Sequence, residues 1–157
     1  MRALLLVLVV SSSSFAGPVL VDRVAAAVDG QLVFRSQVEK RVITQKVSPR
    51  VARAELIDAV LIAKDAGFTP TESEIDGALD TIAKGNAVDR TALEAEVKRQ
   101  GLTVAEYREQ LRGQLLEMRW ILARANGASL KTDEERAALR EKLLAPLRKR
   151  AVIEVFE

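Results

Sequence analysis

A β-hairpin signal near the start of the chain constrains the fold more than any other feature. In VAAAVDGQLVF, residues 24–34, two strand-like runs flank Asp29-Gly30, a dipeptide typical of a type I′ turn. The sequence therefore predicts strands over 21–28 and 31–34. Because a hairpin is at best marginally stable alone in water, another segment must pair with it or cover it.

A second strand-like run lies at the other end of the chain. AVIEVF, residues 151–156, is rich in β-branched residues. Everything between the two runs has helical signals, with helices expected at 36–46, 49–66, 70–84, 89–100, 103–126 and 132–147. We therefore expect a mostly α fold with a small β-sheet (α+β), in which the N-terminal hairpin pairs with the C-terminal strand. The short connections predict a single domain over 17–157.

Helix boundaries are marked by capping residues. Capping boxes are predicted at Ser36–Glu39, Thr69–Glu72, Thr103–Glu106 and Thr132–Glu135, and Ser48-Pro49 marks a further helix start. Helix ends are predicted at Gly67, Gly85-Asn86, Gly101 and Asn126-Gly127. Pro146 interrupts the last helix, which is therefore expected to kink or restart before the final strand.

The first sixteen residues have the pattern of a signal peptide. One basic residue precedes an apolar run over 3–10, and Ser14 and Ala16 occupy the −3 and −1 positions of a cleavage site. We expect export to the periplasm with cleavage after Ala16. The apolar run is too short to span a bilayer and no other stretch is long enough, so stable membrane insertion is not expected.

Composition argues against catalysis. The chain has no cysteine and no histidine, which removes thiol chemistry, the commonest metal ligand and the usual general base. It has no glycine-rich phosphate loop. The formal net charge of +2 comes from 24 basic and 22 acidic residues, and this small excess does not indicate a nucleic-acid-binding surface. We therefore predict no catalytic residue, no cofactor, no metal and no nucleic-acid partner.

The candidate binding surface is the apolar face of the longest predicted helix. Tyr107, Leu111, Leu115, Met118 and Leu122 recur at helical spacing, and Trp120 and Ile121 widen this face. An ordinary helical core explains each residue, but a face broader than one partner helix can cover indicates a groove or an interface. Trp120 fits either the core or the edge of such a groove.

Three smaller features accompany that face. Gly77 and Gly113 lie inside predicted helices, where they either permit close helix crossing or reflect neutral drift. The basic run Arg148-Lys149-Arg150 is expected to form a solvated face.

Several segments resemble the SurA-type periplasmic chaperones. They are VDRVAAAVDGQLVFRSQVE (Val21–Glu39), TESEIDGALDTIAKGN (Thr71–Asn86) and QGLTVAEYREQLRGQLL (Gln100–Leu116), followed by the helix-then-strand ending. The resemblance implies a helical core domain whose sheet joins N-terminal strands to the C-terminal strand. Relatives often carry parvulin-type prolyl isomerase domains before the last helix, but only GASLK separates Asn126 from Thr132 here. Isomerase activity is therefore not expected.

The resemblance implies an ATP-independent chaperone that binds unfolded exported or outer-membrane polypeptides. The peptide-binding residues expected are those of the apolar face of the longest predicted helix: Tyr107, Leu111, Leu115, Met118, Trp120, Ile121 and Leu122. The alternative is a structural or assembly subunit, in which the same apolar face closes a permanent homodimer or partner interface. A permanently covered face would not bind unfolded chains, so the two functions can be distinguished.

Overall fold

The fold contains six helices and a small sheet in the part of the chain that the structure describes. The structure is a computed structural model that describes residues 22–126 and 130–156; the predicted signal peptide lies outside this range. Its elements are β1 (Val24–Val28), β2 (Gln31–Phe34), α1 (Arg35–Gln45), α2 (Pro49–Ala66), α3 (Glu72–Gly85), α4 (Arg90–Arg99), α5 (Val104–Arg124), α6 (Asp133–Arg150) and β3 (Ile153–Val155). No helix among these residues is both long enough and apolar enough to cross a membrane.

The sheet joins the two ends of the described chain, as predicted. Its strand order is β2-β1-β3, and both pairings are antiparallel. Val28 pairs with Gln31 across the hairpin and with Ile153 of the last strand. At the turn, Asp29 and Gly30 both have positive φ, 47° and 83°, as a type I′ turn requires. The hairpin is thus stabilised by β3 on one side and by the helices that bury β1.

Asp29 also fastens the final strand to the hairpin turn. Its backbone N–H donates to the Val152 carbonyl at 2.8 Å, and its carboxylate accepts from the Val152 N–H at 2.7 Å. The ammonium of Lys64 on α2 lies 3.2 Å from the same carboxylate. The pKa of Asp29 is lowered, first by the Val152 hydrogen bond and then by Lys64.

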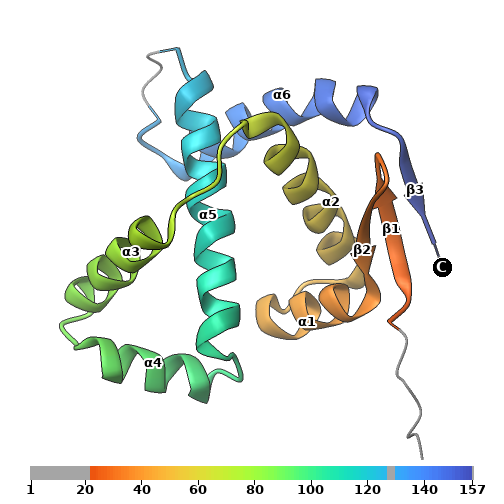
Figure 1. The fold of residues 1–157 in the computed structure, drawn as a ribbon. Helices are drawn as coiled ribbons and strands as arrows, with labels where there is room; N and C mark the ends of the chain where they lie inside the picture. The colour runs from red at the N-terminus through yellow and green to blue at the C-terminus, as the bar shows by residue number, and fades with distance from the viewer. Residues whose placement is uncertain (1–21, 127–129, 157) are drawn as a thin grey trace, which may run out of the picture.

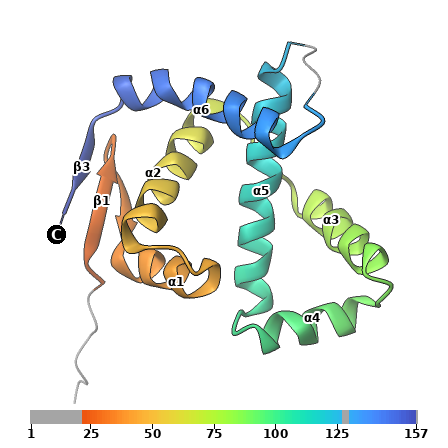
Figure 2. The same cartoon turned by 180° about the vertical axis from the view of Figure 1, so that it is seen from behind.

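Buried apolar side chains form two separate clusters. The main core lies between the sheet, α2, α5 and α6, and includes Val28, Ile62, Trp120 and Leu144. The second, here called the α3–α5 cluster, consists of the buried residues Ile75, Leu79, Ala83, Leu93 and Leu111. Figures 1 and 2 show from opposite sides that α5 lies between α2 and the α3–α4 pair. The longest helix therefore contributes to both clusters.

The capping predictions were confirmed at three helix starts. Ser48 caps α2, and Thr103 and Thr132 form capping boxes with Glu106 and Glu135. Two predictions were wrong. The α3 box is Thr71 with Glu74 rather than Thr69 with Glu72, because the Glu74 carboxylate accepts the Thr71 N–H at 2.7 Å and the Thr71 hydroxyl accepts the Glu74 N–H.

At α1 the helix begins at Arg35, one residue before the predicted start, so Ser36 is not its cap. Gln37 accepts the Phe34 N–H at 2.8 Å, while the Ser36 hydroxyl donates to Asp22. Asp22, from before the sheet, accepts both the backbone N–H and the hydroxyl of Ser36, so this serine donates to Asp22 instead of acting as the predicted cap.

Pro146 does not end α6, which runs to Arg150 instead of stopping at 147. The proline is exposed, whereas Leu144 and Leu147 on either side of it are buried in the main core. Packing on both sides of the proline holds the helix together despite the missing backbone donor.

The interior glycines of α3 and α5 are not needed for close helix crossing. A Cβ added to Gly77 or to Gly113 would meet no atom within 4 Å. Of the two readings left open by the sequence, close packing is therefore excluded at both positions.

Candidate functional site

A groove opens between α2, α5 and α6, with the end of α1 at its edge. Its volume is about 930 Å³. Its large apolar lining residues come from three segments far apart in the sequence: Ile62, Leu116, Met118, Ile121, Leu122 and Leu130. The groove therefore exists only because the fold brings α2 and the start of α6 against α5.

Met118 and Leu122 make the groove a candidate binding surface. Four residues apart on α5, they share one face of the helix. They are 57% and 58% exposed, whereas their neighbour Ile121 is buried against the main core. Two large apolar side chains beside an apolar groove offer a surface that a partner can bury.

The polar residues of the groove are largely paired with one another. Arg41 of α1 lies 3.1 Å from Glu55 of α2, and Arg140 of α6 lies 2.6 Å from Glu117 of α5. Because these opposite charges neutralise each other, the groove does not present a strong field of one sign. This arrangement suits an apolar, extended ligand better than a nucleotide or another anion.

A buried carboxylate holds α6 in place as one wall of the groove. Asp58 of α2 is 4% exposed and accepts two hydrogen bonds from the Arg148 guanidinium, at 2.8 and 2.7 Å. Arg140 adds a longer contact at 3.4 Å. Hydrogen bonding to Asp58 raises the pKa of Arg148. The prediction that the Arg148-Lys149-Arg150 run is a solvated face was therefore wrong for Arg148.

Trp120 lies behind the groove in the main core. It is 0% exposed, and its indole N–H donates to the Asp65 carboxylate at 2.8 Å. Arg124 pairs with the same carboxylate at 2.7 Å and lies over the indole ring. The structure thus places this residue in the core environment that the sequence left as one of two readings.

The predicted binding residues fall into two groups. Met118, Ile121 and Leu122 line the groove. Leu111 is buried in the α3–α5 cluster, with Tyr107 and Leu115 packed against it. The apolar face of α5 thus has two different environments. The start of the helix packs on α3 and α4, while its end faces α2 and α6.

Sequence reasoning missed the contributions of Ile62 and Leu130 to the groove. They lie on other segments, and no local pattern links them to α5. Within the described residues, no group of three or more His, Cys, Asp or Glu is placed to hold a metal ion. The groove therefore offers binding by apolar contact.

Comparisons with known proteins relate the chain to one kind of chaperone. Chaperone SurA of Pectobacterium atrosepticum is 29% identical over 133 residues, which cover 73% of this chain and 31% of that protein. Chaperone SurA of Cupriavidus pinatubonensis is 31% identical over 117 residues, covering 64% of this chain and 23% of the relative. The chain is related to SurA. No family model matches the sequence.

The SurA-like fold is also found among solved structures. PEB4 and the periplasmic protein Cj1289 of Campylobacter jejuni are described as two structurally related SurA-like chaperones. A structure from that work matches with a TM-score of 0.52 and 17% identity, over 81% of this chain and 50% of the other. The predicted fold and the resemblance to SurA are thereby confirmed. The chain spans less than a third of the two SurA relatives named above.

Proposed function

We propose that the protein is an ATP-independent periplasmic chaperone that holds unfolded exported polypeptides in the groove between α2, α5 and α6. Outer-membrane protein precursors are the clients that the SurA relationship suggests. The observation that carries the proposal is the pair Met118 and Leu122, more than half exposed beside an apolar groove in a SurA-related chain. Binding at this surface would lower the population of aggregation-prone species.

The chemistry of the groove supports weak, promiscuous binding. Affinity would come from buried apolar area at about 25 cal/mol per Å², less the cost of ordering the bound chain. Met118 is unbranched and polarizable, so it can adapt to different side chains. We place direct contact on Met118, Ile121 and Leu122, while Trp120 supports the groove from the core.

We further propose that residues 1–16 direct export and that the mature chain is one chaperone domain over 17–157. The fold is similar to that of the SurA-like chaperones PEB4 and Cj1289, and Cj1289 is described as periplasmic. Intact-mass analysis of the exported protein should give a chain that starts at Gly17, and a retained Met1 would contradict the proposal. We assign no isomerase activity, because residues 125–132 between α5 and α6 are too few to form an isomerase domain.

Aggregation suppression tests the proposed function. A urea-denatured outer-membrane protein is diluted into buffer without nucleotide, and light scattering is followed with and without the purified protein. We expect suppression that saturates with chaperone concentration and weakens roughly ten-fold in a Met118→Ser, Leu122→Ser double variant, because about 1–2 kcal/mol of apolar contact is lost. Both residues are exposed, so the melting temperature should change little.

Ile43→Ser is the matched control. Ile43 is 76% exposed on α1 and does not line the groove, so its replacement should leave suppression unchanged. No suppression by the unmodified protein, together with a mass that stays dimeric on dilution, would favour the assembly-subunit alternative. Equal loss in the control and the double variant would contradict the groove as the binding site.

A further inference from the structure

The α3–α4 hairpin forms a lobe of its own on one side of α5. Figures 1 and 2 show it projecting from α5 on the side opposite the sheet, α1 and α2. Its buried residues form the α3–α5 cluster, which is separate from the main core. A segment that packs on one helix through a small separate cluster can open locally at lower free energy than the whole fold.

The attachments of this lobe suit a hinge. Gly101, in the left-handed region with φ of 82°, lies in the segment that joins α4 to α5. Phe68 packs against the main core and Pro70 is buried, so the fixed part of the chain reaches the start of α3. Movement would therefore be absorbed at the few residues between Pro70 and α3 and between α4 and α5.

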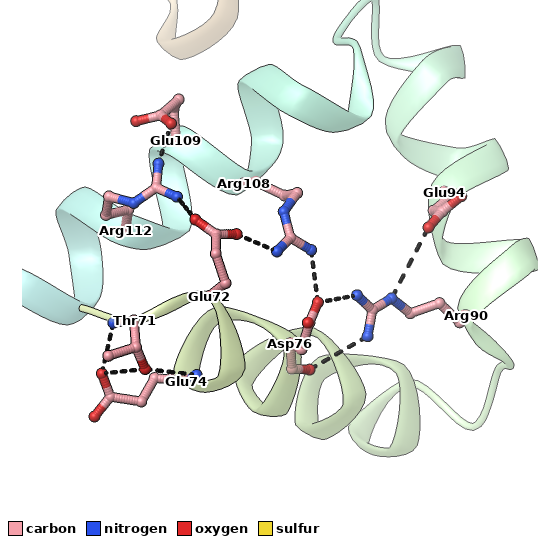
Figure 3. Close-up of polar contacts among 9 residues, drawn as sticks. All are labelled: Thr71, Glu72, Glu74, Asp76, Arg90, Glu94, Arg108, Glu109 and Arg112. Atoms are coloured by element: carbon pink, nitrogen blue, oxygen red, sulfur yellow. Dashed lines mark hydrogen bonds and ion pairs between the residues drawn. The ribbon is translucent and has the colours of Figure 1, made fainter.

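A network of ion pairs holds the lobe against α5 (Figure 3). From α5, Arg108 bonds to both Glu72 and Asp76 of α3, the latter at 2.6 Å, and Arg112 also pairs with Glu72. Within the lobe, Arg90 of α4 bonds to Asp76 at 2.7 Å and to Asp80 at 2.8 Å, so these pairs join α4 to α3.

The remaining charges at this contact complete the network. Arg119 of α5 pairs with Glu74, Glu94 lies beside Arg90, and Glu109 pairs with Arg112. The two carboxylates that accept from Arg108 are 65% and 49% exposed. Salt in solution therefore screens these pairs, and their contribution to closure depends on ionic strength.

We propose that the α3–α4 hairpin opens from α5 as a unit, and that the ion pairs of Arg108 and Arg112 set how often it uncovers Tyr107, Leu111 and Leu115. These side chains pack under the hairpin. Leu115, Met118 and Leu122 follow one another on α5 at steps of three and four, so the uncovered face continues the exposed edge of the groove. Given the proposed function, on which this inference rests, the opening lengthens the apolar surface that an unfolded polypeptide can bind.

Thiol labelling measures the opening directly, because the chain has no cysteine of its own. Leu111→Cys places one thiol under the hairpin, and Leu61→Cys places one in the main core; both leucines are 4% exposed. We expect the first thiol to react at least roughly ten-fold faster than the second, since local opening is easier than global unfolding. Equal rates would overturn the proposal.

A charge variant then tests the role of the ion pairs. Arg108→Gln should accelerate labelling at position 111 roughly five-fold, and added salt should do the same in the parent. Arg99→Gln is the control, because Arg99 pairs with Glu96 inside α4. An unchanged labelling rate in Arg108→Gln, or an equal increase in Arg99→Gln, would contradict the role of the ion pairs.

Should a cysteine variant misfold, amide hydrogen exchange in the unmodified protein should show α3 and α4 exchanging faster than α2.

The labelling needs no polypeptide, so its failure counts against the hairpin and not against the proposed function. The link between the two is tested by affinity. If the uncovered face binds, Arg108→Gln should bind a denatured outer-membrane protein more tightly than the parent, by at most the factor by which it opens more often. Unchanged affinity in a more open variant would overturn the role of this face in binding.

Discussion

At the scale of single residues, the burial of a polar side chain such as Asp58 depends on partners from distant parts of the chain. Asp58 is the one charged residue that is buried in the described part of the chain, and its partners come from α6, far along the sequence. Sequence patterns mark Arg148 as one of three consecutive basic residues and cannot show which of them turns inward. The same limit applies to Trp120, whose burial depends on Asp65 and Arg124.

Removing Arg148 should destabilise the protein through the buried carboxylate that it leaves behind. Arg148→Ala should lower the free energy of unfolding by roughly 2–3 kcal/mol, less than for a fully buried pair because Arg148 is itself partly exposed and Arg140 lies near. Urea unfolding checks this. Lys149→Ala, at the exposed neighbouring position, should change stability by less than about 0.5 kcal/mol. Equal effects of the two substitutions would contradict the assigned role of Asp58.

At the level of elements, helix starts and ends could be predicted where the signal is local. Ser48-Pro49 marks the first residue of α2, and Gly67 with its positive φ marks its end. The start of α1 and the continuation of α6 could not be predicted. At α1, the Ser36 hydroxyl donates to Asp22 instead of capping the helix. At α6, tertiary packing keeps the helix continuous despite the backbone donor that Pro146 lacks. Both errors arise where a distant segment competes with a local rule.

Glu106 connects two elements and should make stability depend on acid. It accepts the Thr103 N–H at 2.8 Å within the α5 capping box and pairs with Lys40 of α1. First the Lys40 pair and then the Thr103 hydrogen bonds lower its pKa from 4.5 to about 2. Because the folded-state pKa is the lower one, this contribution is present above pH 4.5 and is lost as the pH falls toward about 2.

Glu106→Gln is the matching variant, since glutamine can still complete the capping box. Compared with the parent, it should show a flatter fall in urea midpoint between pH 4.5 and 2. In a Lys40→Met background the same substitution should matter less, because the ion partner is already gone. A variant that follows the parent curve throughout this range would show that the pair contributes nothing to stability.

At the scale of the whole molecule, the joining of the chain's two strand-forming ends could be predicted because each end has a strand pattern and a lone hairpin needs a partner. The groove could not be predicted from the sequence. Met118, Ile121 and Leu122 were among the predicted residues, but Ile62 and Leu130 reach it from segments that sequence patterns treat separately. Nor could the pattern show that Tyr107, Leu111 and Leu115 turn toward α3.

Site-directed crosslinking tests the central claim most directly, that unfolded polypeptides bind in the groove of this SurA-related protein. A photoreactive benzophenone is attached at Leu122→Cys, or at Ile43→Cys as the control, and a urea-denatured outer-membrane protein is added by dilution. We predict strong crosslinking from position 122 to the unfolded polypeptide, little from position 43, and little from either to the folded polypeptide. Equal yields at the two positions, or none at position 122, would contradict the proposal.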